Sequence, residues 1–168
     1  SLREIAAADW GGTEIVVEHC DARGGAHAWR KGLLPLDLEI AAVTEARGAG
    51  GAGLGFSVNW GRSAIEERDA GAPERHAARL AGLGLLRGVI FSGATDRDGP
   101  FGEAWSDSHA PFHEQEATST MDRARAKATL AAAGGGLLWD GIKIAVRPVD
   151  LPTADRLALV RAAVALLD

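Results

Sequence analysis

One pattern recurs four times along this 168-residue sequence: a short, nearly continuous apolar run, a polar loop, and a longer helix-forming stretch. The apolar runs cover residues 13–18, 53–58, 88–92 and 141–146. Continuous apolar runs are typical of strands that are buried on both faces of a parallel sheet. Four such strand–helix units in succession therefore predict an α/β fold built of parallel (β/α) units.

Helix signals follow each predicted strand. A helix over residues 37–47 begins with acidic residues, which the helix dipole favours there, and ends at Gly48. The remaining helices are expected over residues 74–83, from a capping Ser119 to residue 133, and from a capping Thr153 to residue 167. Residues 1–9 resemble the end of a helix, so the sequence is expected to start midway through a unit. An open doubly wound sheet is the main alternative, but no G-x-G-x-x-G motif follows any strand.

Composition narrows the class of protein. Apolar residues make up 46% of the chain and the net charge is −5, which is ordinary for a globular protein, and one domain is expected over residues 1–168. No basic stripe and no apolar run of about 20 residues is present, so we expect neither a nucleic-acid nor a membrane partner. The single cysteine, Cys20, excludes an internal disulfide and suits a cytoplasmic protein.

Polar residues gather where the first predicted strand ends. In parallel α/β folds the active site lies beyond the carboxyl ends of the strands. Glu18 and His19 are both candidates there, but neighbouring strand residues point to opposite faces. We expect Glu18 at the site, as a base or a metal ligand, and His19 packed under a helix.

A second group lies in the long loop after the third strand. Asp107 and His109 form a D-x-H pair within residues 93–117, and loops longer than about 15 residues are usually functional or disordered. This pair could act in acid–base catalysis or hold a divalent ion. Trp60, Trp105 and Trp139 lie near strand ends or loops, where their rings could stack on a sugar or pack in the core.

Other candidates could hold a substrate. Asn59 and Arg62 follow the second strand, and the guanidinium of Arg62 can bind a carboxylate, a phosphate or sugar oxygens; the alternative is an ion pair with Glu66 or Glu67. Lys143 lies inside the fourth strand and is expected to point toward the helix layer.

Several segments resemble the xylose isomerase-like (sugar isomerase/epimerase) superfamily of TIM barrels. VVEHCDA (residues 16–22) is similar to its fifth strand, NWGRSAIEE (59–67) to the segment after the sixth, residues 88–109 to the seventh strand with its loop, and WDGIKIAV (139–146) to the eighth. The resemblance implies that the chain is the C-terminal half of a (β/α)₈ barrel. GFSVNWGRSAIEE, GEAWSDSHAPF and LLWDGIKIAV also resemble an uncharacterised bacterial family described as a domain of unknown function.

The metal ligands that the resemblance implies are incomplete. The superfamily usually holds its metal with a Glu, an Asp, a His and a Glu from strands five to eight. Glu18 matches the first, but Asn59 stands for the Asp, Phe91 or Ser92 for the His, and Lys143 or Ala145 for the last Glu. A divalent metal therefore remains possible only with other ligands, such as Glu18 with Asp107 and His109.

The resemblance implies a sugar or sugar-acid isomerase or epimerase that transfers a proton beside a carbonyl. Glu18, Asp107 and His109 would carry the acid–base chemistry, and Asn59, Trp60, Arg62 and Trp105 would hold the substrate. The alternatives are a carbohydrate-binding or regulatory protein with an eroded metal site, and a metal-dependent hydrolase of the endonuclease type. Half a barrel also needs a partner, either the N-terminal half of the barrel or a second copy of the chain.

Overall fold

The computed structural model describes residues 1–23, 27–29, 31–49 and 53–168. Four parallel strands form one sheet in sequential order: β1 (Ile15–His19), β2 (Leu54–Asn59), β3 (Leu86–Phe91) and β4 (Trp139–Ile142). The predicted α/β class and the parallel strand order are therefore confirmed, and the arrangement is consistent with half of a TIM barrel.

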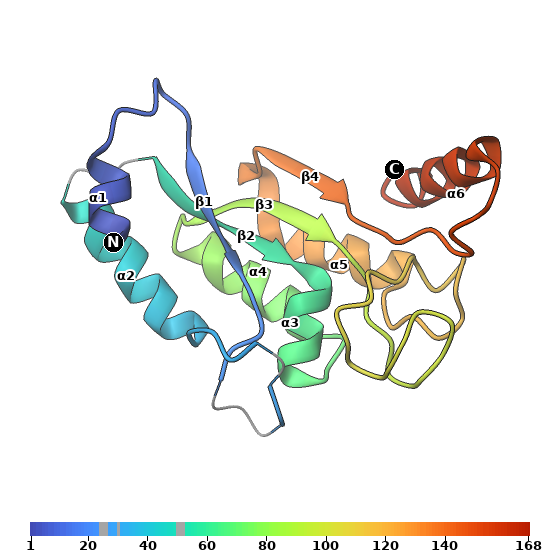
Figure 1. Ribbon diagram of the computed structural model, residues 1–168. Helices are drawn as coiled ribbons and strands as arrows, with labels where there is room; N and C mark the ends of the chain where they lie inside the picture. Colours follow the sequence, from blue (N-terminus) through green and yellow to red (C-terminus); the bar gives the residue numbers. More distant parts are fainter. Residues whose placement is uncertain (24–26, 30, 50–52) are drawn as a thin grey trace.

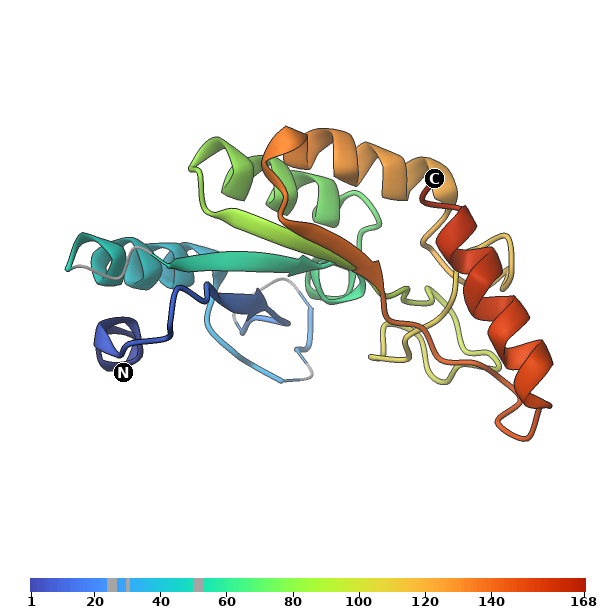
Figure 2. The ribbon, with the colours of Figure 1, turned by 90° about the horizontal axis from the view of Figure 1, so that it is seen from above.

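Helices connect the strands (Figure 1). They are α1 (Leu2–Ala7), α2 (Leu36–Gly48), α3 (Trp60–Glu67), α4 (Ala72–Gly82), α5 (Arg123–Ala133) and α6 (Thr153–Ala165), with a 3₁₀ turn η1 (Gly134–Gly136) after α5. Viewed from above, α4 and α5 lie along one face of the curved sheet, and α6 stands at the end of the molecule beyond β4 (Figure 2). None of the described helices is long and apolar enough to cross a membrane.

The strand register gives the sheet two different faces. Phe56 and Val58 of β2 and Val89 and Phe91 of β3 are fully buried and belong to the core between sheet and helices. Residues at the alternate positions of the strands point to the opposite face of the sheet, which we call the inner face. They include Glu18, Ser57 and Asn59. A bulge between Phe56 and Ser57 shifts the register of β2 against β3, so that Arg87 has no partner residue on β2. The guanidinium of Arg87 donates to Glu14 at 2.8 Å.

Several predicted boundaries are wrong, and three of the differences have a visible cause. Strand β4 begins two residues before the predicted 141–146 and ends at Ile142, because the backbone N–H of Ala145 donates to the carbonyl of His109 in the loop and not to β3. The cap of α5 is Asp122, whose carboxylate accepts from the Arg125 N–H at 2.8 Å, and not Ser119. Thr153 is the first residue of α6, and the preceding Pro152 occupies the cap position.

Candidate functional site

The carboxyl ends of β1 and β2 place two predicted residues side by side on the inner face. Glu18 lies near the end of β1 and Asn59 ends β2. The Asn59 amide donates to Glu18 Oε1 at 2.9 Å. This bond orients the Glu18 carboxylate, which remains exposed on the inner face.

Asn59 also starts helix α3. Its side-chain oxygen accepts from the Arg62 N–H at 3.3 Å, which caps the helix. The helix starts tightly against β3: a Cβ on Gly61 would come within 2.2 Å of the Ser92 carbonyl oxygen, so only glycine fits there. Because α3 starts so close to β3, the next residue, Arg62, is only 5% exposed and lies next to the ends of the strands.

The long loop returns to the same place. Gly93 and Ala110 pair as a short antiparallel bridge, with backbone hydrogen bonds of 2.9 and 3.0 Å, so the loop closes directly after β3. His109, next to the bridge, has a left-handed φ of 53° and places its Nδ1 3.4 Å from the hydroxyl of Ser92. Its Nε2 lies 3.4 Å from Asp107 Oδ1.

Arg62 connects the Glu18–Asn59 pair with the Asp107–His109 pair. Its guanidinium bonds the Asp107 carboxylate, and its Nε is buried with no hydrogen-bond partner. The structure thus links Glu18, Asn59, Arg62, Asp107 and His109 by a continuous series of contacts, which we call the rim network. The ion pair of Arg62 is with Asp107 and not with the Glu66 or Glu67 considered as alternatives.

Burial favours the neutral imidazole of His109. Burial lowers the pKa of His109 below its usual value; the Asp107 carboxylate opposes this, whereas the positive charges of Lys143 and Arg62 add to it. A neutral imidazole can both accept and donate a proton, which is the requirement for acid–base catalysis near neutral pH.

Lys143 lies on the inner face, and the expectation that it points to the helices is wrong. Phe91 pairs with Ile142, and the Lys143 N–H donates to the Phe91 carbonyl at 2.9 Å, so Ser92 and Lys143 are the next residues on the inner face. From the sequence, Ser92 is expected only as a possible replacement of the superfamily's metal-binding His, and Lys143 is expected on the helix side, because only the register of β3 and β4 shows their faces.

The tryptophans do not join the rim network. Trp60 is fully buried in the core and offers no ring face to a substrate, so its predicted stacking role is not possible here. Trp105 packs against the core and lines a separate cavity of about 410 Å³ with Arg97 and His113. Trp139 lies on the inner face below the network, where its ring covers Gly88.

Comparison with known proteins fixes the family. Residues 1–159 match the family described as Domain of unknown function (DUF4862). The chain belongs to this family. An uncharacterized protein of Salmonella typhimurium, STM3670, is 40% identical over 145 residues, which are 86% of this chain but 44% of that relative. The chain therefore spans less than half the length of this relative, and no solved structure matches it.

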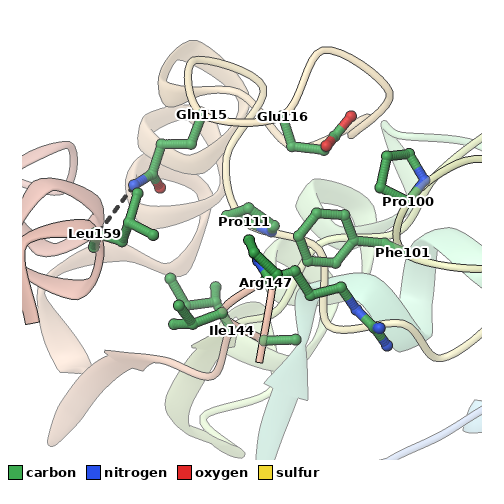
Figure 3. Close-up of a pocket in the computed structure, with 11 residues that line it drawn as sticks. Pro100, Phe101, Pro111, Gln115, Glu116, Ile144, Arg147 and Leu159 are labelled. Atoms are coloured by element: carbon green, nitrogen blue, oxygen red, sulfur yellow. Dashed lines mark hydrogen bonds between the residues drawn. The ribbon is translucent and has the colours of Figure 1, made fainter. Parts of the chain in front are cut away.

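An apolar cavity of about 390 Å³ flanks the rim network in this DUF4862 chain (Figure 3). The loop residues Pro100, Phe101 and Pro111 form one side, and residues 144–148 and Leu159 of α6 form the other. The Arg147 guanidinium lies 5.8 Å from the centre of the Phe101 ring, a cation–π contact. None of the predicted site residues lines this cavity, but it adjoins them because Ala145 bonds the His109 carbonyl.

Glu18, Asp107 and His109 do not converge as metal ligands. In the part of the chain that the structure describes, the group that could hold an ion comprises His19, Glu66 and His76, on the helix side of the sheet. The Asp107 carboxylate is engaged by Arg62 and that of Glu18 by Asn59.

His19 packs under the helices, as expected. The ring is fully buried, and its Nδ1 and Nε2 lie 2.7 Å from Glu39 and 2.8 Å from Glu66. Burial lowers the pKa of His19, but the two carboxylates outweigh it and raise the pKa to about 9. The same contacts outweigh burial at Glu66 and lower its pKa. We call His19, Glu39, Glu66 and His76 the outer cluster.

Proposed function

We propose that this chain supplies the C-terminal half of a barrel enzyme that interconverts isomers of a small sugar or sugar acid by proton transfer beside a carbonyl. The observation that carries the proposal is the rim network: a carboxylate, an imidazole, an amide and a guanidinium held together at the carboxyl ends of β1–β3. Active sites of parallel barrels lie at this edge. The resemblance to the xylose isomerase-like superfamily supports the same reaction class.

Glu18 is the proposed base. It lies on the open inner face, and its hydrogen bond from Asn59 fixes the carboxylate without a positive charge on that partner. Removal of a proton beside a carbonyl needs a carboxylate or imidazole held near the carbon. His109, favoured in its neutral form, is the proposed partner that moves a proton to and from the oxygen atoms.

The positive groups would stabilise the negative charge that forms on the substrate oxygen. Arg62 has a buried Nε with no hydrogen-bond partner, and Lys143 contributes a second positive charge close to His109. Fixed donors that face a developing oxyanion usually give the largest single contribution to such a reaction. Asn59 is fully buried, so it would act through Glu18, whose carboxylate it orients, and not as the predicted substrate ligand.

Deuterium exchange tests this proposal directly. The protein, purified together with the segment or second copy that completes its inner face, is incubated in D₂O with a panel of aldoses, ketoses and sugar acids, and proton NMR follows loss of the C–H signal beside the carbonyl. We expect exchange with at least one compound, and its loss in Glu18→Gln and His109→Gln. Glu74→Gln, an exposed carboxylate at the start of α4, is the matched control and should retain it. Exchange that survives both site substitutions, or none with any compound, contradicts the proposal.

The proposal includes a partner for the inner face. β1 and β4 are the two edges of the sheet, and Trp139 on the inner face is 39% exposed. The Salmonella relative is more than twice as long as the matched segment, which leaves room for four further units. We expect residues 1–168 expressed alone to self-associate or to unfold without cooperativity. A monomer by light scattering that unfolds cooperatively would contradict a half-barrel that needs completion.

A further inference from the structure

The outer cluster brings ligands of three different elements to one point between sheet and helices. His19 comes from β1, Glu66 from α3 and His76 from α4, and one nitrogen or oxygen of each lies within 4.8 Å of the others. His19 is fully buried and His76 is 7% exposed. Their rings meet edge to face with centres 5.1 Å apart.

His19 presents one nitrogen to this point. Its Nδ1 is hydrogen-bonded to Glu39 Oε2 at 2.7 Å, and an ion that binds Nε2 would displace the proton that this nitrogen carries in the metal-free protein. Nε2 lies 2.8 Å from Glu66 Oε2 but lacks hydrogen-bond geometry, and is buried without a hydrogen-bond partner. Metal-bound histidines usually donate their second N–H to a carboxylate, as His19 can to Glu39.

His76 is oriented in a similar way. One nitrogen lies 3.0 Å from the Ser63 hydroxyl and the other 3.0 Å from Glu67 Oε1. The Glu67 carboxylate can only accept, so the lone pair of a neutral His76 ring lies on the nitrogen next to the Ser63 hydroxyl.

Charge also favours a cation here. Three carboxylates, those of Glu39, Glu66 and Glu67, contact the two imidazoles. Two histidines and one glutamate are a ligand set that zinc accepts when a water molecule is its fourth ligand, with bonds of about 2.0–2.2 Å.

We propose that His19, Glu66 and His76 bind one divalent ion of the zinc type, which ties β1 to helices α3 and α4 on the helix side of the sheet. Glu39 acts as a positioning residue through His19. This structural site is independent of the rim network, on whose residues the proposed reaction depends.

Metal titration of the purified protein tests this site. The protein is stripped with a chelator, one equivalent of Zn²⁺ is added, and bound zinc and melting temperature are measured after gel filtration. We expect one retained ion per chain, a higher melting temperature, and an affinity about 10–100-fold weaker in Glu39→Gln. Failure of the wild-type protein to retain zinc would overturn the proposal and leave the cluster as a buried ion pair.

Two variants locate the ion. His76→Ala should lose the retained zinc, whereas His109→Ala in the rim network should keep it; loss in His109→Ala alone would place the ion at the rim and overturn the assignment. If His76→Ala does not fold, zinc-edge X-ray absorption of the wild-type protein decides. Two imidazole ligands with no sulfur are expected, and a single imidazole or a sulfur ligand contradicts the proposal.

Discussion

The rim network and the outer cluster of this DUF4862 chain contain adjacent residues of β1, Glu18 and His19, whose surroundings are opposite. Glu18 faces the inner side of the sheet, where it is exposed and held by one amide hydrogen bond. His19 faces the helices, where it is fully buried between two carboxylates. The alternation of a strand is enough to separate a group that solvent can reach from one that holds the layers together.

The largest expected difference between the two groups is in stability. His19→Ala leaves the half-buried carboxylates of Glu39 and Glu66 without their positive partner, and this should cost about 3 kcal/mol, the lower end of the range for breaking a buried ion pair. Glu18→Gln keeps the shape of an exposed side chain and should change the free energy of unfolding by less than about 0.5 kcal/mol. Urea unfolding in chelator-containing buffer compares the two. Equal losses would mean that the two sides of β1 do not differ as described.

For activity we expect the opposite order: a substitution in the rim network should have the large effect and one in the outer cluster the small effect. On the proposed function, Glu18→Gln removes the base and should slow deuterium exchange about a hundredfold or more, the usual contribution of acid–base catalysis. Glu39→Gln, in the outer cluster, should leave the exchange rate of the folded protein within a factor of about three, because it contacts no reacting group. The rates are compared under conditions in which circular dichroism shows both variants folded. A hundredfold loss in Glu39→Gln would break the separation of the two groups.

Much of the rim network is predictable from sequence, but the outer cluster is not. Glu18, Asn59 and Arg62 follow apolar runs directly, and parallel strand ends must meet at one edge. The partners of His19 come instead from the faces of three helices, 20 to 57 positions away along the chain, and helix packing rather than any local motif brings them together. Lys143 and Trp60 show the remaining difficulty. The face of a strand residue depends on its register, and a tryptophan at a strand end is equally suited to the core or to a ligand.

A smaller effect tests whether the rim network is a coupled unit. The Arg62 guanidinium is nearly buried, and the Asp107 carboxylate that it bonds is 30% exposed. A double-mutant cycle with Arg62→Leu and Asp107→Asn should give a coupling free energy of about 1 kcal/mol in urea unfolding, within the range for residues in direct contact. Arg87 and Glu14 form a similar ion pair at the opposite end of the inner face, and the same double-mutant cycle on this pair gives the value for comparison. Strict additivity for Arg62 and Asp107 would show that the two do not stabilise each other.

The smallest expected effect is a pH dependence that the rim network adds to stability. Burial lowers the pKa of His109 from its ordinary value of 6.5. As the pH falls below about 6.5, the unfolded chain takes up this proton before the folded protein does, so protonation favours unfolding and stability decreases. The decrease ends once the pH passes the lower pKa of the folded state.

His109→Gln cannot titrate, so the difference in unfolding free energy between wild type and variant should be constant above about pH 7.5 and shift in favour of the variant below pH 6.5. Ser108→Ala removes a neighbouring polar group that does not titrate, and its difference from wild type should be flat across the same range. A flat profile for His109→Gln would mean that the Asp107 carboxylate cancels the effect of burial on the pKa of this imidazole. A profile that favours the wild type at low pH would mean that Asp107 outweighs burial and raises the pKa of His109, so that the protonated ring, which cannot accept the proton that the proposed reaction requires, becomes more populated.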